Sequence, residues 1–188
     1  AFAELFTFLN LAQCFGVAII TGLMWFQMEN NEETVRDRGS FIFFFMTFWL
    51  MNACFSGMRT FPPERVILLK ERASGSYQLS AFFLAKSFSE APIRLLLPCV
   101  YLFISYWMAG LNPSAGAFFG VLGTELLATL TGESIGLFIG TVSMDFEKSI
   151  VACTLTMLTM MLVGGFLVEN VPFWIEWLKY LSVFKYAY

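Results

Sequence analysis

The stretch GSFIFFFMTFWLMNACFSGM, residues 39–58, is twenty consecutive residues without a charged side chain. About 20 mostly apolar residues form a helix long enough to cross the roughly 30 Å hydrocarbon core of a membrane. The composition of the whole chain agrees, because 58% of it is hydrophobic and only 13% is charged, whereas soluble domains carry about 25% charged residues. Too few polar side chains remain to cover a globule in water, so we expect the chain to lie in a membrane.

Four further stretches have the same character. They are long and continuously apolar, so we expect helices and not the short alternating strands of a β-barrel. Their ranges are Leu5–Phe26, Ala81–Leu111, Ser114–Met144 and Ser149–Val168. The predicted fold is therefore all-α, with residues 1–188 forming one polytopic membrane domain of five transmembrane helices.

The last residues, Val171–Tyr188, combine several Trp and Tyr side chains with Glu176 and Lys179. Dense aromatic residues beside charges are typical of a helix at the membrane interface. We predict an extracellular interfacial or re-entrant helix here, with a plain amphipathic loop helix as an equally good alternative.

Basic residues in the connections predict the orientation of the spans. The connection between the second and third spans is rich in them, with Arg59, Arg65, Lys70, Arg72 and Lys86. The connection between the first and second spans holds Arg36 and Arg38 among four acidic residues. Because cytoplasmic connections carry an excess of Lys and Arg, the former is predicted to be cytoplasmic and the latter extracellular.

The residue types present exclude several classes of function. The chain has no His, which removes histidine zinc sites and catalytic triads, and we expect neither a metal site nor catalytic residues in this segment. The net charge is −3 with no basic block, so a nucleic-acid partner is not expected. The cysteines lack a CxxC pair and are predicted to be buried free thiols; they are Cys14, Cys54, Cys99 and Cys153.

Charged residues inside a membrane span are costly unless they are paired, face protein or reach the headgroups. Lys86, Glu90 and Arg94 recur every four residues and therefore share one face of the third span. Arg94 is the deepest, and we expect it either to face protein or a cavity, or to snorkel to the interface. In the fourth span, Glu125 and Glu133 are expected to bond to a neighbouring helix, with proton coupling as the sharper alternative.

Glycines recur at four-residue intervals in the fourth span, at Gly132, Gly136 and Gly140 and earlier at Gly116 and Gly120. Small residues at this spacing let two helix backbones approach closely in lipid, so we predict tight helix packing. Residues 132–136 also match the GxSxG nucleophile motif. A nucleophile elbow needs a strand-to-helix turn and a base, so we interpret this match as accidental.

The connection at residues 61–77 contains a predicted short helix. Pro63-Glu64 is a favourable helix start and Ser74-Gly75 a favourable stop. A helix with an apolar centre and charged ends, held just inside the membrane, can be gripped by a cytoplasmic partner. A helix that lies on the membrane surface has a similar composition.

Several motifs occur together at characteristic separations. They are Glu64-Arg65, KERASGSY at 70–77, Glu90-Ala91-Pro92, YWMAGLNP at 106–113, Gly164-Gly165-Phe166 and WLKYLS at 177–182. In these motifs, and over essentially its whole length, the chain resembles the transmembrane domain of G-subfamily (white/brown type) ATP-binding cassette transporters.

The resemblance implies an ATP-driven exporter of lipids, sterols or other amphipathic small molecules. Such a transporter works by alternating access as a homodimer or a heterodimer with a second half-transporter, and the plasma membrane is the expected location. The resemblance also implies a nucleotide-binding domain of the same protein, where ATP and Mg²⁺ bind, and a final span, both beyond this segment. No Lys in the chain follows a Gly, so the segment itself holds no GxxxxGK phosphate loop and no cofactor is expected in it.

The resemblance further implies roles for individual residues. A substrate cavity at the dimer axis is implied for Asn52, Phe55, Arg94, Thr154, Leu158 and Met161. An extracellular gate is implied for Phe166 and Leu167. The coupling helix that rests on the nucleotide-binding domain is implied for Glu64, Arg65, Glu71 and Arg72.

Two other classes of function compete with export. A passive lipid scramblase or channel would expose a continuous polar groove, to which only Lys86, Glu90 and Arg94 point. An integral-membrane lipid-modifying enzyme would need clustered His, Asp or Cys within the spans, and the sequence has no such cluster.

Overall fold

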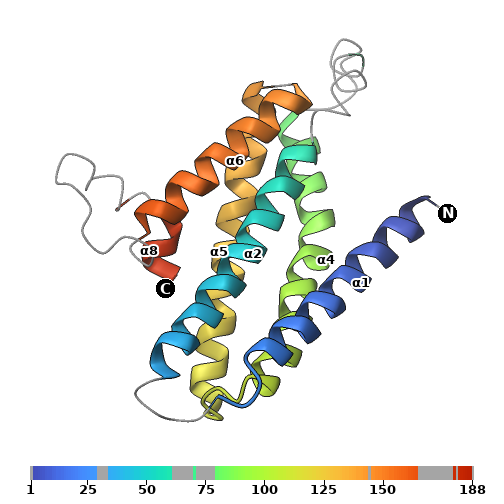
Figure 1. Ribbon diagram of the computed structural model, residues 1–188. Helices are drawn as coiled ribbons and strands as arrows, with labels where there is room; N and C mark the ends of the chain where they lie inside the picture. Colours follow the sequence, from blue (N-terminus) through green and yellow to red (C-terminus); the bar gives the residue numbers. More distant parts are fainter. Residues whose placement is uncertain are drawn as a thin grey trace.

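A computed structural model describes residues 2–28, 34–60, 70, 79–143, 145–164, 180 and 182–187. Every regular element in this part of the chain is an α-helix (Figure 1). The helices are α1 (Phe2–Met24), α2 (Val35–Thr60), α4 (Leu79–Met108), α5 (Ala115–Ser143), α6 (Phe146–Val163) and α8 (Val183–Ala187). The predicted all-α fold is thereby confirmed, and the five long helices coincide with the five predicted spans.

Three of these helices, α2, α5 and α6, are by themselves long and apolar enough to cross a membrane. The other two contain shorter apolar stretches, Phe8–Met24 in α1 and Arg94–Met108 in α4.

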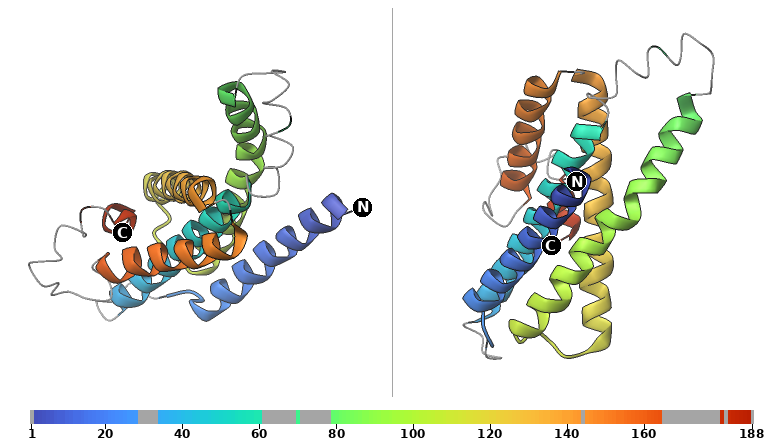
Figure 2. Two further views of the ribbon diagram at one scale, coloured as in Figure 1. Left: turned by 90° about the horizontal axis from the view of Figure 1, so that it is seen from above. Right: turned by 90° about the vertical axis from the view of Figure 1, so that its right-hand side faces the viewer.

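The central pair of the bundle is α2 and α5, which lie side by side (Figure 1). On one side, α1 packs mainly against α4, and on the other α6 and α8 cover the central pair. Figure 2 shows that α1 and the first turns of α4 lead away from the central pair in different directions. The bundle therefore consists of an α1–α4 unit and an α2–α5–α6–α8 unit.

Three glycines of α5 determine how closely α5 approaches α2. Each faces a backbone carbonyl of α2: Gly132 faces Leu50, Gly136 faces Cys54, and Gly140 faces Met58. A Cβ atom would come within 2.8 Å of the carbonyl oxygen at the first position and 2.6 Å at the third, so any larger residue would push the helices apart. Because both sets advance by four residues in the same direction, α2 and α5 run parallel. The predicted tight packing is confirmed at these positions.

The earlier glycines of α5 behave differently. A Cβ atom on Gly120 would meet nothing within 4 Å, and one on Gly116 would meet only the hydroxyl of Ser114. The prediction of close helix packing is therefore wrong for this pair within the described chain, because no other helix lies against the positions where Gly116 and Gly120 would carry a Cβ atom.

Two apolar clusters fill the bundle. The first joins α2, α5, α6 and α8 through residues that include Leu50, Cys54, Met58, Cys153, Met157 and Phe184. The second joins α1, α2 and α4 around the fully buried Tyr101. The Tyr101 ring stacks on Phe45 with ring centres 5.1 Å apart and meets Trp49 edge-on at 5.8 Å. The aromatic second span thus contributes to both clusters and packs its own unit against the α1–α4 unit.

The ends of α1 and α4 are joined by backbone hydrogen bonds. The amides of Gln27 and Met28 donate to the carbonyls of Met108 and Ala109 at 3.0 and 3.1 Å, which satisfies groups left without partners at a helix end. Gly110 follows with φ +66°, a conformation that glycine adopts without strain. These bonds hold the two helices together as one unit.

The short helix α8 packs on the bundle. Phe184 is 2% exposed and its ring centre lies 5.8 Å from that of Phe43 in α2. The hydroxyl of Ser182 donates to the carbonyl of Met160 in α6 at 2.7 Å. A helix was predicted for Val171–Tyr188, but the structure describes only residues 180 and 182–187 of this range. Within them, Ser182 and Phe184 contact the bundle. The other residues of the predicted helix lie outside the described residues.

Candidate functional site

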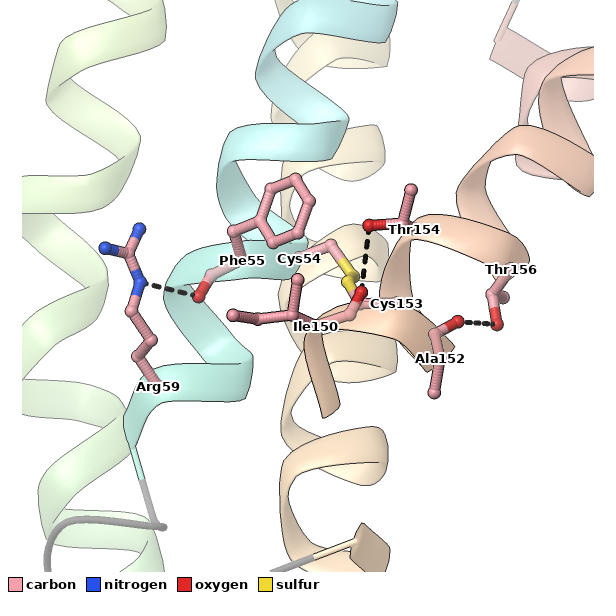
Figure 3. The surroundings of a disulfide bond; sticks show 8 residues. All are labelled: Cys54, Phe55, Arg59, Ile150, Ala152, Cys153, Thr154 and Thr156. Carbon is pink, nitrogen blue, oxygen red and sulfur yellow. Dashed lines mark hydrogen bonds between the residues drawn. A yellow bond between two sulfur atoms is a disulfide. The ribbon is translucent and has the colours of Figure 1, made fainter. Parts of the chain in front are cut away.

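The implied cavity residues come mainly from two helices that pack against each other, α2 and α6. Figure 3 shows Phe55 of α2 on one side of a pair of bonded cysteines and Thr154 of α6 on the other. Their chain neighbours Cys54 and Cys153 are joined by a disulfide that bridges 99 residues of sequence. The structure therefore places the second-span and fifth-span positions of the implied cavity on two helices that contact each other.

The disulfide between Cys54 and Cys153 corrects the prediction that all four cysteines are free. Their Cα atoms lie 6.9 Å apart, and both side chains are buried where α2 contacts α6. Spacing along the sequence could not reveal this pair, because helix packing alone brings the two residues together. Cys14 is a buried free thiol, as predicted, whereas Cys99 is free but only half-buried.

On the α2 side, the site has one aromatic ring, and the polar side chains near it form hydrogen bonds to backbone carbonyls of α2 itself. Phe55 is half-buried and packs against the first apolar cluster. Its carbonyl accepts a hydrogen bond from Nε of Arg59 at 3.1 Å, as Figure 3 shows. One turn before Phe55, the side-chain amide of Asn52 donates to the carbonyl of Phe48 at 2.8 Å.

The α6 side is apolar apart from hydroxyl groups that also bond within their helix. Thr154 donates to the carbonyl of Ile150 at 2.8 Å. Leu158 is 42% exposed, and Met161 is half-buried against the first cluster. Because the hydroxyl proton is already used, this side can hold a ligand chiefly by covering its apolar surface, which stabilises binding by about 25 cal/mol per Å².

This face of α2 and α6 has the composition of a surface that binds apolar molecules. It combines an aromatic ring, an adaptable thioether and aliphatic side chains with one amide, a combination typical of pockets for apolar ligands. Within the part of the chain that the structure describes, no group of three His, Cys, Asp or Glu side chains could hold a metal ion.

Arg94 of α4 lies apart from this face. Its guanidinium forms an ion pair with the carboxylate of Glu133 in α5 and donates to the hydroxyl of Thr60 in α2 at 3.2 Å. The two charged side chains are only 17% and 8% exposed. Of the two expectations for Arg94, the structure supports the protein-facing one, since the side chain ties three helices together instead of reaching for headgroups.

The expectations from the sequence treat Arg94 and Glu133 separately and do not pair them. A signal was available, because they are opposite charges within predicted spans, where an unpaired charge is costly. Glu133 does bond to a neighbouring helix, as expected. The side chains of Lys86 and Glu90 lie outside the described residues.

Glu125 departs from the same expectation. Its side chain is fully buried, and one carboxyl oxygen accepts a hydrogen bond at 3.4 Å from Thr129 of its own helix. The other oxygen, Oε2, has no partner among the described residues. The predicted bond to a neighbouring helix is therefore wrong for Glu125.

Two groups of implied site residues cannot be placed. The gate residues Phe166 and Leu167 lie outside the described residues. So do the coupling-helix residues, which are Glu64, Arg65, Glu71 and Arg72.

Comparison with known proteins gives a consistent result. The family model for ABC-2 type transporters matches residues 3–188. ABC transporter G family members 22 and 21 of Arabidopsis thaliana are 37% and 35% identical over 98% of this chain, covering 25% and 27% of their own lengths. ABC transporter G family member 1 of Dictyostelium discoideum is 33% identical over 94% of this chain and 23% of its own. The chain thus spans about a quarter of the length of these relatives.

Proposed function

Because this chain belongs to the ABC-2 type transporter family, we propose that it is the translocation domain of an ATP-driven exporter of lipids, sterols or other amphipathic small molecules. The observation that carries the proposal is the match over 98% of the chain to G family transporters. These relatives are about four times as long, which leaves room for a nucleotide-binding domain that binds ATP and Mg²⁺. The plasma membrane remains the proposed location.

The face formed by Asn52 and Phe55 of α2 and by Thr154, Leu158 and Met161 of α6 is the proposed substrate surface. A second half-transporter, identical or different, brings a second such face across a two-fold axis, and the two Phe55 rings then flank a flat amphipathic substrate. Stacking on an aromatic ring adds roughly 0.5 to 1.5 kcal/mol per pair beyond burial. Transport requires that this surface contact substrate differently in the inward-open and outward-open states.

In this proposal, a coupling helix that includes Glu64, Arg65, Glu71 and Arg72 transmits movement of the nucleotide-binding domain to the substrate surface. Its charged ends would contact the nucleotide-binding domain, so that nucleotide-driven movement is passed to the cytoplasmic ends of α2 and α4. The proposed gate at Phe166 and Leu167 would close the cavity on the opposite side. Reversal of one charge, Glu71→Lys, should leave the protein folded but lower the ratio of transport to ATP hydrolysis.

The pairing of Arg94 favours an exporter over a passive scramblase. A scramblase needs a polar groove open to lipid headgroups, and Arg94 was its deepest candidate residue. In the structure that guanidinium is bound to Glu133 and Thr60 inside the bundle. A lipid-modifying enzyme is also disfavoured, because neither the amide nor the hydroxyl on the α2–α6 face is paired with a base.

The full-length protein in proteoliposomes tests this proposal. Movement of a fluorescent phosphatidylcholine or a fluorescent sterol should require ATP, and Phe55→Ala should reduce it without loss of folded protein. Phe103→Ala is a matched control, since Phe103 is 63% exposed on α4 in the other unit. Equal movement without ATP would identify a scramblase, and a chemically altered lipid would identify an enzyme; either result would contradict the proposal.

A further inference from the structure

The helix α6 buries one narrow stripe of side chains against the bundle. The stripe consists of Ser149, Cys153 and Met157, which recur every four residues and therefore lie on one face of the helix. Large apolar side chains on its other faces are exposed, among them Val151 at 59% and Leu155 at 60%. A single row of buried side chains gives a helix little resistance to rotation about its own axis, so the placement of α6 depends on how this row is fixed.

The hydroxyl groups of α6 are used within the helix and do not fix it to α2. Each of its threonines donates to a carbonyl one turn earlier in α6; the donors are Thr154, Thr156 and Thr159, each at 2.8 Å. Ser149 donates in the same way to the carbonyl of the N-cap residue Asp145 at 2.7 Å. Because a hydroxyl has one proton to donate, these donors are already engaged. Along the stripe, apolar packing and the Cys54–Cys153 disulfide hold α6 to α2.

The disulfide joins the middle of this stripe to a residue that is fixed from its other side. The carbonyl of Cys54 is the group against which Gly136 of α5 packs, and this is the closest of the three glycine contacts between α5 and α2. The side chains of Cys54 and Cys153 are fully buried. The disulfide therefore extends the firm contact between α5 and α2 to α6 through a covalent bond.

The proposed substrate surface is built on the residues next to this disulfide. Phe55 follows Cys54, Thr154 follows Cys153, and Figure 3 shows the disulfide between these two side chains. Phe55 and Met161 both pack against the apolar cluster that contains the two cysteines. A displacement of α6 by one residue would move it about 1.5 Å along its axis and turn it by about 100°. Such a displacement would change the side chains that α6 contributes to the surface.

We propose that the Cys54–Cys153 disulfide positions the substrate surface, so that the affinity for an amphipathic ligand depends on whether this pair is oxidised. While the bond is intact, α2 and α6 keep one spacing and one rotation, and Phe55 and Thr154 move together in both access states. When the bond is broken, α6 keeps its apolar stripe but loses the link that fixes its rotation. This inference rests on the proposed function for the identity of the substrate surface.

A purely stabilising disulfide would behave differently. The bond closes a loop of 99 residues, and such a closure restricts the unfolded chain and raises stability without any change in the folded state. That role predicts a lower melting temperature on reduction and an unchanged affinity of the folded protein. The dissociation constant of a ligand therefore distinguishes positioning from stabilisation.

Ligand binding to the full-length protein in nanodiscs tests the proposal. The probe is whichever of a fluorescent sterol and a fluorescent phosphatidylcholine binds more tightly, measured before and after treatment with dithiothreitol. Two thiols of the reagent pass two electrons and two protons to the disulfide, which becomes two cysteine thiols while the reagent closes to a cyclic disulfide. We expect the dissociation constant to rise about two- to tenfold, the factor for losing one contact of the aromatic-stacking class, and to recover on reoxidation.

Alanine variants make the same comparison without a reductant. Cys54→Ala and Cys153→Ala each break the bond, so each should weaken binding as much as the double variant does, whereas two independent packing losses would add. Dithiothreitol should not change the affinity of the double variant. Cys14→Ala is a matched control, because Cys14 is a buried free thiol of α1, and it should bind the probe as the unmodified protein does.

The distance between α2 and α6 provides a readout that needs no ligand. Spin labels can be attached to ketone-bearing residues placed at Phe44 of α2 and Leu155 of α6, which are 39% and 60% exposed. Electron–electron resonance then gives the distribution of distances between the labels. We expect a broader distribution when Cys54 and Cys153 are both replaced by alanine.

Unchanged affinity in the double alanine variant, together with weakened binding in Phe55→Ala, would overturn the positioning role and leave the proposed function standing. Unchanged affinity in Phe55→Ala would show that the proposed surface is wrong. In that case the label distances decide alone, and an unchanged distribution would overturn the positioning role as well. If the alanine variants do not fold, reduction of the protein already folded in nanodiscs still decides.

Discussion

The ion pair between Arg94 and Glu133 should be a major contribution to the stability of the bundle, and Arg94→Met tests it. This change keeps most of the side-chain volume but leaves the Glu133 carboxylate, 8% exposed, without its cationic partner. A charge left alone in a buried site typically costs 3–5 kcal/mol. We expect the free energy of unfolding of the full-length protein in nanodiscs, followed by tryptophan fluorescence, to fall by about that amount.

A variant with both Arg94 and Glu133 replaced distinguishes the free energy of the ion pair from the cost of leaving one buried charge without a partner. Glu133→Met alone should destabilise by a similar amount, whereas Arg94→Met with Glu133→Met should recover most of the loss, because an apolar pair replaces the ion pair without burying a charge. The coupling free energy should therefore be at least about 3 kcal/mol.

A matched control exists within the same chain. Lys148 and Asp145 form an ion pair at 3.3 Å with side chains 78% and 47% exposed. Exposed pairs contribute only about 0.2–1 kcal/mol, so Lys148→Met should have little effect. If the two substitutions at Arg94 and Glu133 were simply additive, or each cost less than about 1 kcal/mol, the argument that this pair is a buried link between helices would be refuted.

Three further predictions concern packing, the disulfide and topology. Gly136→Leu should separate α2 from α5 and destabilise the protein by at least about 1–3 kcal/mol, whereas Gly120→Leu, with nothing within 4 Å of its Cβ position, should leave the melting temperature unchanged. Peptide mapping without reductant should recover Cys54 linked to Cys153, and Cys153→Ser should lower the free energy of unfolding by about 2–5 kcal/mol; recovery of both as alkylated thiols would contradict the pairing. In a cysteine-free background, a Cys placed at Ser76 should react with an impermeant reagent only from the cytoplasmic side, and labelling from outside would reverse the predicted topology.

The helices themselves could be predicted because hydropathy depends on local composition. The charge-free stretch at 39–58 lies within α2, and the predicted end at Val168 lies five residues beyond the end of α6 at Val163. Glycine spacing likewise pointed to a close contact, since only small residues allow two backbones to touch. The sequence could not show that Gly132 makes such a contact and Gly120 does not, because the spacing is identical and only the placement of α2 distinguishes them.

The sequence by itself determined that the chain is a helical membrane domain, roughly where each span begins and ends, and which charges lie inside the spans, because these properties follow from residue types counted along the chain. The tertiary structure decided which side chains meet: Arg94 with Glu133, Cys54 with Cys153, and Phe43 with Phe184. Partners of this kind depend on how each helix is rotated about its axis and which helix lies beside it. Those quantities are set by the fit of many side chains at once, so no local pattern encodes them.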